Sequence, residues 1–123
     1  MSIDRLSAEA MEKILNGKVK EEATCVVKFY SNDCHFCHAL SDYYKDISEE
    51  EEFDNVHFFA FNIKDNPDLE KRMSFRGVPT ISLIKTTEVS KPPRIRIMPD
   101  PDPPNQKTWY FTKDIKEFIN KEK

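Results

Sequence analysis

Two cysteines separated by two residues are the part of this sequence best suited to chemistry. They form the run Cys34-His35-Phe36-Cys37. Thiols one helical turn apart lie on nearly the same face and can form a disulfide. If a helix begins at the first thiol, its unpaired N–H groups and dipole lower that thiol's pKa from about 8.5 to roughly 3.5–7.5. Cys34 could then attack a disulfide, and Cys37 could resolve the mixed intermediate.

Two of the three histidines, His35 and His38, lie within or directly after this motif. A protonated imidazole near Cys34 would stabilise its thiolate, and the reduced form with it, which makes the site more oxidising. We expect some influence from His35, because it lies between the cysteines. For His38, a ring that points to solvent is an equal alternative.

The surrounding pattern predicts the elements that hold this motif. Residues 25–30 include β-branched and aromatic residues at both odd and even positions, as expected for a strand covered on both faces. An apolar stripe with helical spacing begins close to Cys34. The other predicted elements are a brief strand around Ile3 and Leu6, a helix from the N-cap Ser7 to Gly17, strands 56–62, 80–84 and 94–98, a short helix capped by Asn66 with Pro67 at its first position, and a last helix capped by Thr112. Strands that alternate with helices and end in a hairpin predict an α/β fold, a mixed sheet between two helical layers.

Composition sets the class of protein. The 123 residues include 19 Lys and Arg against 22 Asp and Glu, which gives a formal charge of −3 and no electrostatic case for nucleic-acid binding. No apolar run approaches the roughly 20 residues that span a bilayer. We expect a single monomeric domain over residues 1–123. The acidic first residues do not resemble a secretory signal, which predicts the cytoplasm; the alternative is the endoplasmic reticulum lumen or another oxidising compartment, if a leader has been removed.

Three segments carry a resemblance to a known family. Residues 26–37, 61–67 and 76–80 together resemble the thioredoxin superfamily, above all thioredoxins and single domains of protein disulfide isomerases. The likeness runs from about Leu6 to Ile119. It implies a thioredoxin fold, with Cys34 as nucleophile and Cys37 as resolving thiol. It also implies that Pro79 is a cis-proline, and that Val78, Pro79 and Phe36 contact the substrate.

Three positions depart from the family pattern. Lys28 stands where the family usually has a buried acid, six residues before the first cysteine. It either extends to solvent or lies near the sulfurs as a cation, which would lower the thiol pKa values without acting as a carboxylate base. Asp33 replaces the usual tryptophan and opposes the histidines electrostatically. The proline-rich residues 99–104 lengthen a normally tight turn, and we interpret them as a passive extended loop, with a partner contact as the alternative.

Other interpretations of the motif are weaker. Residues 34–38 also satisfy the c-type haem attachment pattern, but a buried strand precedes them. Adjacent His and Cys side chains diverge, so we expect no metal site. Cys25, in a buried strand, is expected to be an inert core residue. His57 is expected to occupy an ordinary strand position, and Trp109 to pack against the last helix rather than join a site.

The predicted function is thiol–disulfide exchange with protein substrates through Cys34 and Cys37, with no cofactor beyond the cysteine pair. A flavin-containing reductase or glutathione would regenerate the pair. The alternative is a thioredoxin-fold binding module with little redox turnover, which Lys28, Asp33 and the proline-rich segment favour.

Overall fold

One mixed β-sheet organises the chain. The structure, a computed structural model, describes residues 3–88 and 91–123. Along these residues the strands are β1 (Asp4–Arg5), β2 (Ala23–Tyr30), β3 (Val56–Asn62), β4 (Thr80–Thr86) and β5 (Arg94–Ile97), and the helices are α1 (Ala8–Leu15), α2 (His35–Ser48), α3 (Leu69–Arg72) and α4 (Thr112–Glu122), with short 3-10 turns at Glu51–Phe53 and Ile63–Asp65. The strand order in the sheet is β1-β3-β2-β4-β5.

Strand directions follow the predicted order of elements. β3 pairs in parallel with β1 and β2, while β4 pairs antiparallel with β2 and β5. β2 is therefore central, and Lys28 in its middle lies opposite Ala60 of β3 and Ile81 of β4. Exposed and half-buried residues alternate along β5, which is the pattern of an edge strand packed on one face.

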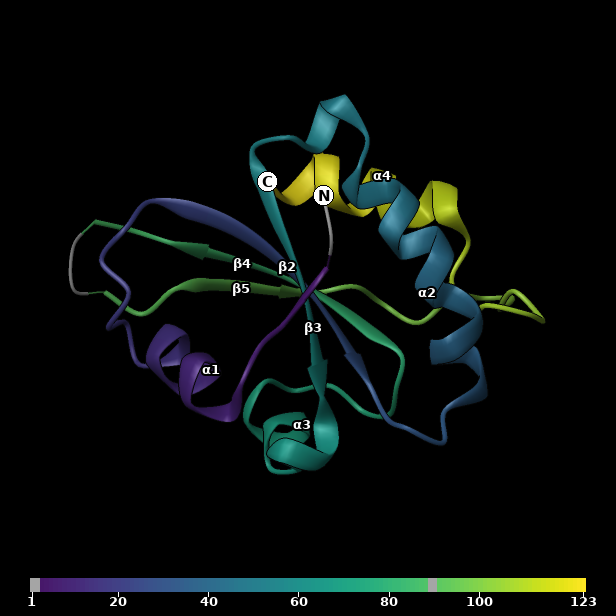
Figure 1. Ribbon diagram of the computed structural model, residues 1–123, viewed down its shortest axis with the longest axis horizontal. Helices are drawn as coiled ribbons and strands as arrows, with labels where there is room; N and C mark the ends of the chain where they lie inside the picture. Colours follow the sequence, from purple (N-terminus) through teal and green to yellow (C-terminus); the bar gives the residue numbers. More distant parts are fainter. Residues whose placement is uncertain (1–2, 89–90) are drawn as a thin grey trace.

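Helices cover both faces of the sheet (Figure 1). On one face, α2 and α4 pack over a core that includes Val26, Leu40, Tyr44 and Ile119. On the other face, α1 and α3 pack over a second core, to which Phe29 of β2 contributes. Successive residues of β2 point to opposite faces, so Val26 and Lys28 share the α2 side. This arrangement confirms the mixed sheet with helices on both faces.

Three predicted helix starts can be compared with the structure. Ser7 is the N-cap of α1, and its side chain accepts a hydrogen bond from the Ala10 N–H at 3.1 Å, as predicted. The short third helix begins later than predicted, because residues 66–68 form a turn and Asp68, not Asn66, is its N-cap. Thr112 is the first residue of α4 rather than its cap, a position that Phe111 takes. Both errors move a boundary by three residues or fewer and leave the order of elements intact.

The proline-rich residues 99–104 lie outside the sheet, as predicted. They contain a cis Asp102–Pro103 peptide bond. The chain that follows is held by a reciprocal pair of backbone hydrogen bonds between Asn105 and Trp109, at 2.9 and 3.0 Å. The Asn105 side chain also accepts hydrogen bonds from the backbone N–H groups of Lys107 and Thr108. Residues 105–109 thus form a fixed turn. Within the described ranges, no helix has the length and apolar character needed to cross a bilayer.

Candidate active site

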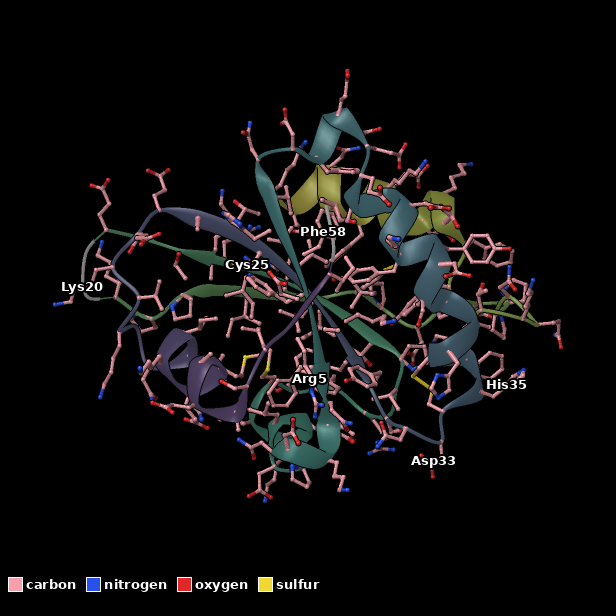
Figure 2. All side chains as sticks on the ribbon, in the orientation of Figure 1. Arg5, Lys20, Cys25, Asp33, His35 and Phe58 are labelled. Carbon is pink, nitrogen blue, oxygen red and sulfur yellow. A yellow bond between two sulfur atoms is a disulfide. The ribbon has the colours of Figure 1, made fainter. Side chains whose placement is uncertain are left out.

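Cys34 and Cys37 form a disulfide at the N-terminus of α2 (Figure 2), with Cα atoms 5.2 Å apart. Cys34 is the N-cap residue in extended backbone conformation, and its Sγ accepts a hydrogen bond from the Cys37 N–H at 3.1 Å. Cys34 is half-buried, whereas Cys37 is only 2% exposed. In the reduced protein the same N–H and the helix dipole favour a thiolate at Cys34. The structure therefore confirms that the cysteine pair begins a helix directly after a buried strand.

Asparagines fix the loop between β2 and α2. The buried side chain of Asn62, at the end of β3, donates a hydrogen bond to the Asn32 side-chain oxygen at 3.1 Å. The Asn32 carbonyl lies 2.6 Å from Nε2 of His38, close enough for a hydrogen bond from that ring. The loop is thereby tied to the neighbouring strand and to the first turn of α2. Sequence reasoning missed Asn62, and its position at the end of a predicted parallel strand beside β2 was the signal available.

A second loop approaches the disulfide from the start of β4. The Val78–Pro79 peptide bond is cis, as the family resemblance implied. The Val78 carbonyl oxygen lies 3.7 Å from Cys34 Sγ. Gly77 adopts a positive φ of 79°, a region that favours glycine, and its carbonyl accepts a hydrogen bond from Thr80 Oγ1 at 2.8 Å. The structure brings Val78 and the cysteines together across 44 residues of sequence.

A groove of about 290 Å³ lies beside the disulfide. Its lining includes Phe36, Val78 and Pro79, the three residues that the sequence suggested for substrate contact, together with Trp109. The ring centroids of Trp109 and Phe36 lie 5.7 Å apart. Trp109 packs against the core under α2 and α4, as expected, and it also lines this groove, which the sequence did not indicate. No local signal identified it, because the fixed turn at residues 105–109 carries it to Phe36.

Lys28 is buried on the other side of the disulfide. Its residue is 5% exposed, and its Nζ lies 5.3 Å from the Tyr44 ring centroid and 5.9 Å from that of Tyr30. Nζ donates a hydrogen bond to Ser41 Oγ at 3.2 Å, and that hydroxyl donates to the Cys37 carbonyl at 3.1 Å. Burial lowers the pKa of Lys28 from 10.5 to about 8. Of the two positions expected for this side chain, the structure shows the one beside the cysteine pair.

The remaining charged residues of the motif lie at the surface. His35 and Asp33 are exposed and lie on the outer side of the α2 start and of the preceding loop (Figure 2). His35 stacks edge-on against Phe36, with ring centroids 6.0 Å apart, and Asp33 accepts a hydrogen bond from Ser31 Oγ at 3.0 Å. His38 is also exposed.

Cys25 and His57 lie apart from the site. Cys25 is buried and unbridged, and burial raises the pKa of its thiol to about 11. Figure 2 shows it well separated from the yellow bond of the disulfide. His57 occupies an exposed position on β3. Among residues 3–88 and 91–123, no three side chains of His, Cys, Asp or Glu gather as they would around a metal ion.

The sequence matches a known protein family over most of its length. The sequence profile of the thioredoxin family matches residues 5–120. A Schizosaccharomyces pombe protein described as a candidate protein disulfide-isomerase is 31% identical over 71 residues, which are 58% of this chain. The match spans only 14% of that relative's length.

Solved structures share the fold. A thioredoxin of Malassezia sympodialis gives a TM-score of 0.66 at 12% identity, covering 98% of this chain and 90% of its own. Chloroplastic thioredoxin z gives 0.64 at 21% identity, covering 98% and 94%. The J-Trx1 fragment of ERdj5 gives 0.63 at 16% identity, covering 97% and 49%. At these identities the likeness establishes the arrangement of strands and helices.

Proposed function

The chain belongs to the thioredoxin family, and we propose that it exchanges disulfides with protein substrates through Cys34 and Cys37. The observation that carries this proposal is the bridged cysteine pair at the first turn of α2. Cys34, the first residue of the pair, is half-buried rather than enclosed, and its Sγ lies beside the Val78 carbonyl. A structural disulfide in the core would offer no sulfur to a second protein.

The reaction follows from the positions of the two sulfurs. In the reduced protein, the Cys34 thiolate accepts the Cys37 N–H and attacks one sulfur of a substrate disulfide, which releases the other substrate sulfur as a thiolate. Cys37 then attacks Cys34 Sγ, forms the bridge seen here and releases the second substrate thiolate. The substrate gains two electrons and the cysteine pair loses two. The reverse sequence oxidises a dithiol substrate.

The groove beside Cys34 supports a polypeptide as substrate. Val78 presents its carbonyl next to the reacting sulfur, where an extended chain could pair with it. Phe36 and Trp109 add an aromatic wall on which apolar side chains can pack. We further propose that His35 and His38, when protonated, and Asp33, acting in the opposite direction, modulate the reduction potential, since these residues lie at or beside the first turn of α2. A reductase or glutathione would return the pair to its working state; the cytoplasmic location stays a prediction.

Turnover on a disulfide-bonded polypeptide tests the proposal. Catalytic amounts of the reduced chain are mixed with insulin and excess glutathione, and the appearance of free insulin thiols is followed. We expect the rate to exceed that of glutathione alone and to scale with chain concentration. The Cys34→Ser variant, matched in size, should give only the background rate. If the wild-type chain binds the polypeptide but does not accelerate its reduction, the binding-module alternative holds.

A further inference from the structure

A lysine amine in the core is unusual, and Lys28 lies in the central strand of the sheet. Nζ has one hydrogen-bond partner, Ser41, and two aromatic rings nearby. Within the described part of the chain, no carboxylate lies at ion-pair distance from this amine. A buried ammonium without a counterion is costly, so the environment favours loss of its proton.

The same amine is connected to the resolving cysteine. Lys28 and Cys37 line one cavity of about 430 Å³, which lies between α2 and the sheet and opens to solvent. Ser41, one turn after Cys37 on α2, bridges them by accepting from Lys28 Nζ and donating to the Cys37 carbonyl. The volume of this cavity is enough to hold water. Because both residues line it, the cavity offers a route for a proton between the amine and the reduced Cys37.

Other charged or titratable side chains face this cavity, and their positions distinguish them from Lys28. The set comprises Arg5 from β1, Tyr30 from β2, and His38, Asp42, Tyr44 and Lys45 from α2. Arg5 forms an ion pair with Asp65 at 2.8 Å, and the Tyr44 hydroxyl lies 2.7 Å from the Phe59 carbonyl. Burial raises the pKa of Tyr44 well above its ordinary value, so it does not accept a proton near neutral pH. His38, Asp42 and Lys45 are exposed.

Lys28 is thus the buried group of this cavity whose proton equilibrium lies near physiological pH. With a pKa of about 8, about a tenth of the amine is neutral at pH 7. Reduction of the disulfide places a second titratable group, the Cys37 thiol, in the lining of the same cavity. A thiolate and an ammonium there stabilise each other, because each supplies the counterion that the other lacks.

We propose that Lys28 accepts the proton of Cys37 when Cys37 resolves the mixed disulfide, a role that rests on the exchange function proposed above. The Cys37 thiol gives its proton to the neutral amine, and the resulting thiolate attacks Cys34 Sγ. The Cys34–substrate bond breaks, the substrate sulfur leaves as a thiolate, and the ammonium returns its proton to that thiolate through solvent. No electrons enter or leave beyond those exchanged between the disulfides.

A titration of Lys28 in both redox states tests the link directly. The Cε and Hε signals of lysine are followed by NMR across pH in the oxidised chain and in the chain reduced with dithiothreitol, and Lys28→Met assigns the signal. We expect the Lys28 midpoint to rise by about one unit or more on reduction, because the Cys37 thiolate then faces the ammonium. An unchanged midpoint would overturn the proposal. Lys45, which lines the cavity but is exposed, is the internal control and should not shift.

Kinetics separate the two sulfur steps. Reduced chain mixed with Ellman's reagent should release one thionitrobenzoate when Cys34 attacks and a second when Cys37 resolves. We expect Lys28→Met to slow the second phase about tenfold at pH 7, with recovery as the pH is raised and the thiol ionises unaided. Lys28→Arg keeps a charge but cannot release a proton, so it should not restore the wild-type pH profile, and Lys45→Met should leave both phases unchanged.

Each outcome has a defined meaning. A wild-type profile in Lys28→Met, or its full recovery in Lys28→Arg, would show that Lys28 does not carry the proton. Loss of the first phase in the wild-type chain, or no turnover on insulin, would instead contradict the exchange function. The NMR titration does not depend on either result, since dithiothreitol reduces the bridge chemically.

Discussion

The two sulfurs of one disulfide lie in different surroundings. Cys34 is half-buried beside the Val78 carbonyl and the groove that Phe36 and Trp109 help to line. Cys37 is 2% exposed and lines the cavity that also contains Lys28. Cys34 is therefore the more accessible of the two cysteines, and Cys37 shares a cavity with a buried titratable group. The difference indicates that the first sulfur is placed to engage a partner and the second to release it.

The two surroundings also differ in their effect on the stability of the folded chain. The groove side combines the packed rings of Phe36 and Trp109 with the charged side chains Arg76 and Asp100, and Thr80 Oγ1 donates a hydrogen bond to the Gly77 carbonyl. The cavity side keeps an amine 5% exposed with a serine as its hydrogen-bond partner. A desolvated lysine lowers the stability of the folded chain. Its position near a reactive cysteine therefore indicates a functional rather than a structural role.

The largest expected effect comes from removing each of the two sulfurs in turn by mutation. Cys34→Ser should abolish exchange, because it removes the attacking thiolate. Cys37→Ser should retain attack but accumulate a covalent mixed disulfide, because nothing remains to resolve it. Non-reducing gels with a disulfide-bonded polypeptide measure both. A trapped adduct on Cys37 in the Cys34→Ser variant, together with no adduct on Cys34 in the Cys37→Ser variant, would reverse the assignment.

The next effect concerns the stability cost of the cavity. The folded-state pKa of Lys28 is lowered to about 8, so below pH 8 the folded chain bears an unfavourable charge that the unfolded chain solvates freely. Lys28→Met should raise the free energy of unfolding of the oxidised chain at pH 7 by about 2 to 3 kcal/mol. The wild-type value should approach that of the variant between pH 8 and 10.5, where the unfolded chain holds more protons than the folded one.

Urea unfolding at several pH values measures this difference, and comparison with the variant cancels the titration of other groups. An advantage of the methionine variant that stays constant up to pH 10.5 would show that Lys28 is not desolvated as the structure indicates.

A smaller effect is expected on the groove side. Trp109→Ala removes one half of the aromatic wall and should lower kcat/KM about three- to tenfold for peptide disulfides with apolar residues next to the cysteine. It should leave the Ellman's reagent phases unchanged, since that reagent does not fill the groove. Phe111→Ala is the matched control, because Phe111 is an aromatic residue with 40% exposure. If kcat/KM fell equally in the two variants, the groove would not determine the preference for apolar residues in the substrate.

The smallest effect on exchange is expected at Cys25. Its buried thiol has a pKa raised to about 11, so it is protonated under working conditions. Cys25→Ala should leave the exchange rate unchanged in the insulin assay. A lower rate would show that a third sulfur takes part in the reaction.

Much of the fold was predictable from local patterns. Strand β3 has the predicted bounds, because β-branched and aromatic residues continue from Val56 to the polar Asn62. Helix α2 begins at His35, directly after its N-cap Cys34 and close to the predicted position, since an extended cap residue and an apolar stripe coincide there. The caps at Asn66 and Thr112 were wrong because side chains that suit a cap also suit the turn before a helix or its first residue.

The candidate site was predictable only where neighbouring residues define it. The cysteine pair follows from spacing, but the position of Lys28 depends on β2 being central and on α2 covering that face. Ser41 gains its role only from that packing. Trp109 reaches the groove through the turn closed by Asn105. In this turn Trp109 adopts a positive φ of 67°, a conformation that is uncommon for a bulky residue and could not be predicted from the residue type.

Alkylation of the reduced chain, mapped by mass at each cysteine across pH, tests the central claim most directly. The account predicts that Cys34 is modified rapidly at neutral pH, that Cys37 follows much more slowly, and that Cys25 stays unmodified in the folded chain. Cys34 reacting no faster than a free cysteine, or Cys34 and Cys37 reacting at equal rates, would contradict the division of roles between the two sulfurs.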